Sequence, residues 1–447
     1  MHEYLDLPLS YRGAPVRGKD YQFLEAVTWS FISSSFFGVR YSPIGSLFDV
    51  GGSSYFIGKD KIFSVTGFLC SKVAFEFMKV FNPTLNFQVG NVSDLPYFVP
   101  NLDKSNQIAE EAIQKAREDW DSFETSWDFQ TFPLLRDDLK TATVAESFTN
   151  WERYCNANIK RMQELEIDNN RLFINAYGLN DELSPEVPED QITLARADAP
   201  ADMRRLISYA VGCMMGRYSL EEPGLIYADS GNIGFDPSRY QTFTADADGI
   251  IPVTDLEWFD GDAANRFSEF VRRAWDDDTY AQNLAWIAAQ LSAKSGEMPV
   301  ETIRRYFSAQ FFKDHMQTYK KRPIYWLFSS GKQKAFECLV YLHRYNESTL
   351  SRMRNEYVTP LMGKLAARIE HATKERDDAT TGSAKNKLQK QLDVLLKKQH
   401  ELAAFDEQLR HYADQRIHID LDDGVRANYG KFGTLLAEVK TIAAASE

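Results

Sequence analysis

The most distinctive segment of this sequence reads Tyr319-Lys-Lys-Arg-Pro-Ile-Tyr-Trp-Leu-Phe-Ser-Ser-Gly-Lys332 and continues through Gln-Lys-Ala-Phe-Glu-Cys-Leu-Val-Tyr-Leu-His-Arg to Tyr345. It concentrates aromatic rings and positive charge in a chain whose net charge is −13. Large apolar side chains alternate along residues 324–328, which predicts a strand, and residues 329–332 supply a turn. The next apolar side chains recur at helical spacing at Phe336, Leu339 and Val340. The pattern therefore predicts a strand, a turn and a helix in this order.

The turn at residues 329–332 has the chemistry of an anion site. A Ser-Ser-Gly-Lys turn that opens a helix offers backbone N–H groups, two hydroxyls and an ammonium group. Three cations precede it and one lies within it, so the candidate contacts to phosphate groups are Lys320, Lys321, Arg322 and Lys332. The turn lacks the spacing of a nucleotide-binding P-loop, and the alternative is a plain connection between two elements.

Length and composition indicate a globular protein. Of the 447 residues, 44% are hydrophobic and 13% aromatic, which suits about two to four domains. The four cysteines are far apart in the sequence, so they suggest neither a disulfide framework nor a zinc ribbon. The sequence has no secretory leader pattern and no run of about 18 apolar residues, so we expect a cytoplasmic protein without a membrane span.

The charge is distributed unevenly along the chain. Residues 1–100 carry 8 basic and 8 acidic side chains, residues 101–300 carry 18 and 37, residues 301–360 carry 11 and 5, and residues 361–447 carry 14 and 14. The local field, and not the total charge, governs contact with phosphates. We therefore expect that the acidic middle does not contact DNA and that residues 301–360 can.

The first hundred residues favour a small twisted sheet. Residues 30–35, 37–42 and 48–56 are rich in β-branched, aromatic, serine and glycine residues, which predicts strands. One helix is expected over residues 67–80, before Asn82-Pro83, and a further strand over residues 85–89.

The remainder favours helices. We expect helices at residues 103–115, 144–177 and 203–218, and a further apolar helical face formed by Trp120, Phe123 and Trp127, with Asp119, Asp121 and Glu124 in solvent. Asp262 is a candidate N-cap and Pro299 suits a first helical turn. Two helical patterns near the C-terminus predict an antiparallel hairpin. The first is an amphipathic run at residues 358–369. The second consists of leucines at a spacing of seven, namely Leu388, Leu395, Leu402 and Leu409.

These patterns predict an α+β fold that is predominantly α. We expect a mixed α/β domain at residues 1–101, a helical spacer and linker at 102–190, a mainly helical domain with the basic aromatic segment at 191–351, and the helical hairpin at 352–447.

No self-contained catalytic site is expected. Asp49-Val-Gly-Gly-Ser-Ser54 resembles a glycine-rich cofactor loop, but strand-like residues follow it where such a loop requires a helix. Amino-methyltransferases hold the flipped adenine with a characteristic loop. The segments whose sequences come nearest to that loop are only Asn82-Pro83-Thr84 and Ser42-Pro43-Ile44. One set of residues loosely matches the carboxylates and lysine that surround Mg²⁺ in nucleases, and we interpret the match as a coincidence. The set is Asp422, Glu438 and Lys440. We expect no bound cofactor and no metal in this chain.

Several sequence words, in this order and spread over most of the chain, resemble the C-terminal half of the PglX family, the adenine-specific DNA methyltransferases of BREX phage-defence systems. They are Phe37-Gly-Val-Arg-Tyr-Ser-Pro, Phe48-Asp-Val-Gly-Gly-Ser-Ser, Asn82-Pro-Thr-Leu-Asn-Phe-Gln-Val-Gly-Asn, Asp119-Trp-Asp-Ser-Phe-Glu-Thr-Ser-Trp-Asp-Phe, Ile207-Ser-Tyr-Ala-Val-Gly-Cys-Met-Met-Gly-Arg-Tyr-Ser and Lys321-Arg-Pro-Ile-Tyr-Trp-Leu-Phe-Ser-Ser-Gly-Lys.

The resemblance implies a target-recognition domain at residues 1–101 and a helical C-terminal region. It also implies that the catalytic half, which binds S-adenosylmethionine, lies outside this chain. We therefore expect a piece of a longer enzyme, for example the product of a split gene, which does not transfer methyl groups alone.

Within the recognition domain, polar side chains in strands and loops are candidate contacts to base edges or phosphates. They are Ser33, Ser34, Arg40, Tyr41, Ser53, Ser54, Asn86, Gln88 and Asn91. The alternative for each is a local backbone cap.

The partners that the resemblance implies are double-stranded DNA, the missing methyltransferase domain, other BREX proteins and phage inhibitor proteins that mimic DNA. The competing hypothesis is a scaffold that docks defence proteins without reading DNA.

Overall fold

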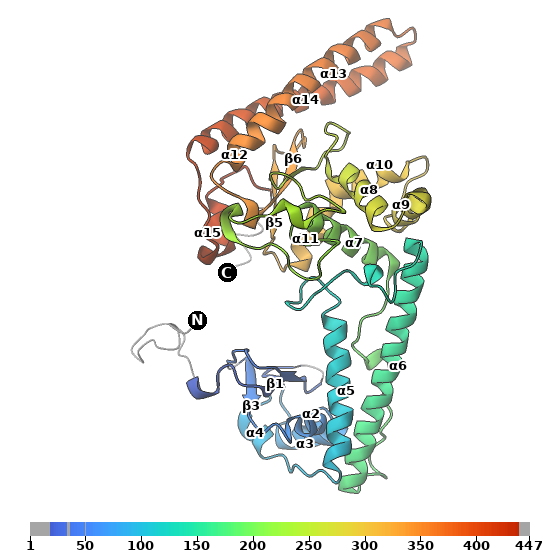
Figure 1. Ribbon diagram of the computed structural model, residues 1–447, viewed down its shortest axis with the longest axis vertical. Helices are drawn as coiled ribbons and strands as arrows, with labels where there is room; N and C mark the ends of the chain where they lie inside the picture. The colour runs from blue at the N-terminus through green and yellow to red at the C-terminus, as the bar shows by residue number, and fades with distance from the viewer. Residues whose placement is uncertain (1–17, 34–35, 50, 438–447) are drawn as a thin grey trace. The chain divides into compact units, whose positions relative to one another are not determined.

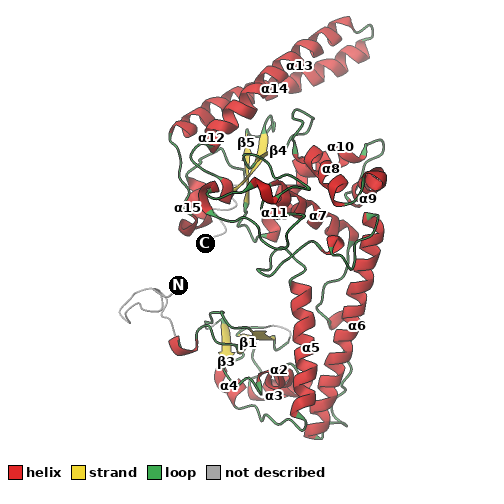
Figure 2. Cartoon of the chain, viewed as in Figure 1, coloured by secondary structure: helices red, strands yellow, loops and turns green. Residues whose placement is uncertain are grey.

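The computed structural model describes residues 18–33, 36–49 and 51–437, which fall into two compact units. Unit 1 comprises residues 1–120 and 153–196, and unit 2 comprises residues 121–152 and 197–447. Helices predominate in both units, and each unit holds one three-stranded sheet (Figures 1 and 2). The predicted fold class, α+β and predominantly α, is confirmed. The four-part division of the chain stays a proposal.

The sheet of unit 1 is antiparallel throughout. Its strands are β1 (Ala26–Ser30), β2 (Val39–Ser42) and β3 (Gly52–Tyr55), in the order β2-β1-β3. The expected sheet is confirmed, but its first strand ends at Ser30, where we had expected a strand over residues 30–35 to begin. The buried Trp29 explains the position of this strand, because it packs into the core of the unit and its Nε1 donates to the carbonyl of Phe87 at 2.9 Å.

Helix α2 (Ile62–Leu69) packs against β1 and β2 of this sheet, and α5 (Leu102–Trp120) packs against α2. Unit 1 also contains α3 (Lys72–Phe81), α4 (Val89–Ser93) and the part of α6 (Val144–Tyr177) from residue 153 onward. The single helix expected at residues 67–80 is two helices, because the Ser71 hydroxyl accepts from the Ala74 N–H and starts a new helix there. The strand expected at residues 85–89 is wrong: only Asn86 makes a bridge, to Ile32, and α4 begins at Val89.

The helices of unit 2 include α7 (Ala199–Met214), α8 (Ala263–Ala274), α9 (Tyr280–Gln290), α10 (Pro299–Tyr306), the π-helix η7 (Phe307–Phe311) and α11 (Phe312–Thr318). Two of them, α8 and α10, begin where their predicted capping residues lie. Asp262 caps α8, since its Oδ1 accepts from the Ala264 and Asn265 N–H groups at 3.0 and 2.9 Å. Pro299 occupies the first turn of α10. α9, which lies between them, was not predicted.

The helix expected around Trp120, Phe123 and Trp127 does not form. α5 ends at Trp120, and residues 121–128 make a series of turns. Trp127 is 99% exposed, whereas Glu124, expected in solvent, is partly buried and accepts a hydrogen bond from the Ser208 hydroxyl.

The sheet of unit 2 contains β4 (Ile250–Pro252), β5 (Tyr325–Ser329) and β6 (Glu337–Tyr341) in the antiparallel order β4-β6-β5. The strand predicted at residues 324–328 is confirmed. The helix predicted after the turn is wrong, because Phe336 leads into β6 and Cys338 pairs with Phe328 across a hairpin.

The C-terminal region forms the expected antiparallel hairpin. α12 (Thr349–Arg352) and the π-helix η9 (Met353–Val358) lead into α13 (Thr359–Asp378), and α14 (Gly382–Asp414) returns beside it (Figure 1). α15 (Gly424–Gly430) follows. We call α13 and α14 together the arm. Within the described ranges, no helix combines the length and apolar character needed to cross a membrane.

Short 3-10 turns connect these elements. They are η1 (Lys19–Tyr21), η2 (Pro133–Leu135), η3 (Glu189–Gln191), η4 (Ser230–Asn232), η5 (Pro237–Arg239), η6 (Asp277–Thr279), η8 (Leu342–Arg344) and η10 (Leu421–Asp423).

Candidate nucleic-acid interface

The register of the unit 1 sheet sorts its polar side chains onto two faces. Thr28 pairs with Arg40 of β2 on one side and with Ser54 of β3 on the other. Directly paired residues project from the same face of a sheet, so these three side chains form a cross-strand row. We call Thr28, Arg40 and Ser54 the polar row. The sequence predicted Arg40 and Ser54 but missed Thr28; its signal was the alternation with the buried neighbours Val27 and Trp29.

The polar row is available for contact. The Arg40 side chain is exposed, and its only described hydrogen bond runs from Nη1 to the carbonyl of its neighbour Val39 at 2.8 Å. The Thr28 hydroxyl donates to the carbonyl of Ser53 at 3.1 Å, and the Ser54 hydroxyl donates to that of Gly52 at 3.3 Å. Both hydroxyl oxygens keep lone pairs, and the guanidinium keeps free N–H groups, so the row can contact base edges and phosphates.

Two predicted residues lie on the opposite face, toward the helices. Ser53 pairs with Trp29 and is buried. Tyr41 pairs with Val27, packs its ring against Phe63 and donates its hydroxyl to Glu25 at 3.0 Å. Burial, followed by the hydrogen bond to Glu25, raises the pKa of Tyr41. The structure therefore does not bring Ser53 and Tyr41 together with the polar row.

The loop after β1 and the loop before α4 lie side by side. The Phe87 N–H donates to the Phe31 carbonyl at 2.7 Å, and the Ser33 N–H donates to the Leu85 carbonyl at 3.0 Å. This pairing brings the predicted residues Ser33 and Asn86 close together. Ser34 lies outside the described residues.

The other two predicted residues of this loop differ in their surroundings. Gln88 is exposed at the start of α4, where its side chain makes no capping bond. Asn91 accepts a hydrogen bond from Asn82 Nδ2 at 3.1 Å, and the same nitrogen donates to the Asn86 carbonyl at 2.6 Å. Asn91 therefore helps to shape the loop, whereas Gln88 projects from it.

The turn of the β5–β6 hairpin already holds an anion from the chain itself. The Glu401 carboxylate of α14 accepts from the Ser330 hydroxyl at 2.8 Å and from the N–H groups of Gln333 and Ala335 at 2.7 and 3.2 Å. Gly331 has φ 129°, and a Cβ there would lie 3.1 Å from Glu401 Oε2. The sequence correctly indicated an anion-binding turn, but no helix follows the turn and an internal carboxylate fills it.

The four predicted cations of this segment do not form one group. Lys320, Lys321 and Arg322 lie before β5 and are exposed, whereas Lys332 is exposed in the turn beyond its other end. The five residues of β5 separate them by about 16 Å at 3.3 Å per residue. A buried histidine holds the backbone that follows the first group of cations. His315 Nε2 accepts from the Ile324 and Tyr325 N–H groups at 3.1 Å each. Burial lowers the pKa of His315 to about 3.

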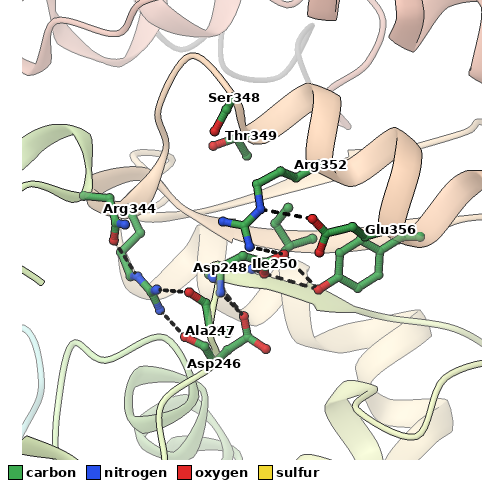
Figure 3. Close-up of polar contacts among 12 residues, drawn as sticks. Asp246, Ala247, Asp248, Ile250, Arg344, Ser348, Thr349, Arg352 and Glu356 are labelled. Carbon is green, nitrogen blue, oxygen red and sulfur yellow. Dashed lines mark hydrogen bonds and ion pairs between the residues drawn. The ribbon is translucent and has the colours of Figure 1, made fainter. Parts of the chain in front are cut away.

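A buried polar network links the base of the arm to the region before β4 (Figure 3). Tyr357 donates its hydroxyl to Asp248 at 3.2 and 3.1 Å, and Arg352 lies 3.6 Å from the same carboxylate. Arg344 donates to the carbonyls of Asp246 and Ala247 at 2.6 and 2.9 Å. Burial, followed by the nearby Asp246, raises the pKa of Asp248 to about 7. Its central carboxylate, Asp248, is buried, so these contacts are those of a structural anchor.

The residues of the glycine-rich segment do not fit a cofactor loop. Asp49 Oδ1 accepts from the Gly51 and Gly52 N–H groups at 2.8 and 3.2 Å, so the segment's own carboxylate occupies the donors that a cofactor would need. β3 follows directly, and the next helix begins only at Ile62. Of the loose nuclease-like set, Glu438 and Lys440 lie outside the described residues. Residues 18–33, 36–49 and 51–437 contain no cluster of three His, Cys, Asp or Glu residues that could hold a metal ion.

Comparison with known proteins identifies relatives along nearly the whole chain. The chain is 43% identical over 480 aligned residues to the adenine-specific methyltransferase BrxX of Escherichia coli O9:H4 (strain HS), covering 99% of this chain and 39% of that protein. It is 39% identical over 416 aligned residues to the adenine-specific methyltransferase PglX of Lacticaseibacillus casei (strain Zhang), covering 92% of this chain and 34% of that protein.

No protein-family model matches the chain. The chain spans between a third and two fifths of the length of the two curated relatives, a share that fits the partial resemblance seen in the sequence words. This chain is therefore homologous to part of the adenine-specific methyltransferases BrxX and PglX.

Proposed function

We propose that this chain is the DNA-recognition part of a BREX N6-adenine DNA methyltransferase. In this proposal the S-adenosylmethionine site and the catalytic residues belong to a methyltransferase domain outside this chain, and the enzyme acts in the cytoplasm. Its partners are double-stranded DNA, that domain, other BREX proteins and phage inhibitors that mimic DNA.

The polar row is the observation that supports this proposal best. Its members come from three strands, so the backbone hydrogen bonds of the sheet hold their spacing. A rigid row of one guanidinium and two hydroxyls suits a groove of DNA, since an arginine can bind a guanine through two hydrogen bonds and a hydroxyl can bind any base. Ser33, Asn86 and Gln88 add exposed or half-buried polar groups on the neighbouring loops.

Equilibrium binding of a fluorescent DNA duplex tests the proposal. We expect the affinity of the unaltered chain to fall as salt rises, because phosphate contacts release counterions. Arg40→Ala is expected to weaken binding to a target duplex by about 1–3 kcal/mol, roughly tenfold or more. The matched control is Lys160→Ala, which removes one exposed charge from α6.

Absence of binding at low salt, or binding that is indifferent to salt, would contradict the proposal. Equal losses for Arg40→Ala and Lys160→Ala would leave DNA binding in place but remove the polar row from it. Lys320, Lys321, Arg322 and Lys332 remain proposed phosphate contacts, and charge reversal at these four positions tests them in the same assay.

A scaffold function is the second candidate, and Trp127 favours it. This indole is 99% exposed and stands next to Asp128, so it suits a protein surface better than a phosphate backbone. Tryptophan is enriched among the residues that dominate protein interfaces. Under this hypothesis Trp127→Ala abolishes co-purification with separately expressed BREX proteins, while DNA binding does not change.

A further inference from the structure

The outward face of α14 carries three lysines that the proposed DNA-recognition function does not yet include. At 100° per residue, Lys387, Lys390 and Lys397 fall within a sector of about 80°, opposite the sector of Leu392 and Leu395. The two leucines are buried, whereas the three lysines are exposed. We call these three residues the lysine row. It runs about 15 Å along the helix, at 1.5 Å per residue.

The lysine row differs from three cations of α13 that are paired: among the residues that the structure describes, no carboxylate lies within ion-pair distance of the lysine row. On α13, Arg368 pairs with Glu375 at 3.0 Å, Lys374 with Glu370 at 2.8 Å and Arg376 with Asp377 at 2.7 Å. None of the ion pairs found among the described residues includes a member of the lysine row.

The local charge is strongly positive. Residues 382–398 contain five lysines and one aspartate, although the whole chain has a net charge of −13. Of these lysines, only Lys398 is buried, and it pairs with Asp255 at 2.6 Å. The field over this face of α14 therefore attracts anions even though the protein as a whole repels them.

The surface around the lysine row favours a phosphate backbone over a protein partner. Val394, 49% exposed, is the apolar residue that lies within the row's sector. A stable protein interface needs an apolar centre, usually with aromatic anchors, and depletes lysine. Contacts to a DNA backbone need only cations at the right distance, and about 15 Å of duplex presents roughly nine phosphate charges.

We propose that the lysine row binds the phosphate backbone of duplex DNA, without reading sequence, so that the arm is a second DNA contact of this chain. This inference rests on the proposed DNA-recognition function. It assigns a binding role to the arm.

Salt-dependent binding of an arbitrary duplex of about 30 base pairs tests the inference. In the full chain, the triple variant K387Q/K390Q/K397Q should weaken binding equally for all duplex sequences. Each phosphate contact contributes about 0.9 to the slope of log affinity against log salt, so loss of three should reduce the slope by about 2.7. The charge-preserving variant K387R/K390R/K397R should keep the slope.

The matched control removes the same number of charges from the neighbouring helix. R368Q/K374Q/R376Q neutralises cations that already have carboxylate partners, and it should leave the slope nearly unchanged. A circular dichroism melt checks that both triple variants stay folded. If the lysine-row triple variant melts early, the double variant K390Q/K397Q replaces it. The expected change in slope is then about 1.8.

The outcomes separate this inference from the function on which it rests. If the unaltered chain does not bind DNA, both fail. If it binds with a salt slope that K387Q/K390Q/K397Q does not change, or changes no more than the control does, the lysine row has no part in DNA binding and the proposed function stands without it.

Discussion

At the scale of single residues, Glu401 decides what the β5–β6 turn can bind. The Ser-Ser-Gly-Lys sequence indicates an anion-binding turn, and the structure confirms that chemistry, with an internal carboxylate as the anion. Glu401 lies 71 residues after Ser330 in the sequence, so no local pattern could have revealed the contact. An external phosphate would have to displace a group that is already well placed.

Replacement of Glu401 is expected to destabilise the hairpin. Glu401→Ala leaves the Gln333 and Ala335 N–H groups and the Ser330 hydroxyl without their acceptor, and water can replace it only in part. We expect a loss of about 1–3 kcal/mol in the free energy of unfolding, measured by urea denaturation. Glu407→Ala, an exposed position on the same helix, serves as the control and should change stability by less than about 0.5 kcal/mol.

Asp248 gives unit 2 a predictable pH dependence. Its pKa in the folded chain is about 7, raised from 3.8 by burial and by Asp246, although Tyr357 and Arg352 also face it. The pKa of Asp248 is higher in the folded chain than in the unfolded chain. The contribution of Asp248 to the free energy of unfolding is therefore complete below about pH 3.8 and is lost as the pH rises to about 7. The ionised carboxylate is therefore the costly form.

An uncharged side chain at this position should remove that cost. We expect Asp248→Asn to gain stability relative to the unaltered chain as the pH rises from 4 to 7, by no more than about 4 kcal/mol for a shift of about three pKa units. Urea denaturation at several pH values measures the difference. A constant difference across this range would show that Asp248 does not titrate there.

At the scale of elements, helices with local signals were predictable, whereas the fully buried strand β6 was not. Asp262 and Pro299 mark the starts of α8 and α10, and the leucines spaced by seven predict the arm. β6 was mistaken for a helix because all five of its residues are buried. A strand that is buried on both faces shows no alternation between apolar and polar residues, so its pattern cannot be told from that of a buried helix.

The apolar seam of the arm should dominate the stability of that element. Leu402 is fully buried, so Leu402→Ala is expected to cost about 2–5 kcal/mol in the free energy of unfolding. Leu396 lies on the same helix but is 44% exposed, and Leu396→Ala should cost far less. Equal costs at the two positions, measured by urea denaturation, would contradict the packing described for α14.

At the scale of the whole molecule, the two units have separate hydrophobic cores. Val27 and Phe173 lie in the core of unit 1, and Leu402 is buried within unit 2. Compact units with their own cores commonly unfold as separate cooperative transitions.

Calorimetry can test this division. We expect two thermal transitions, with Val27→Ala lowering the midpoint of one and Leu402→Ala lowering the midpoint of the other. A single transition that both variants shift equally would show that the units unfold together.

The sequence by itself determined the fold class, most helices of both units, the antiparallel arm and the relationship to adenine-specific methyltransferases. These features depend on caps, periodicity and sequence words, which are encoded within one segment of the chain. The tertiary structure decided which polar groups remain available to a partner. Thr28 joins Arg40 and Ser54 through strand register, Ser53 faces the core, Glu401 fills the turn, and the lysine row lacks the carboxylates that pair with its neighbours on α13. The strand register, the burial of Ser53 and the filled turn depend on pairing between residues far apart in the sequence, and local preferences do not encode such pairing.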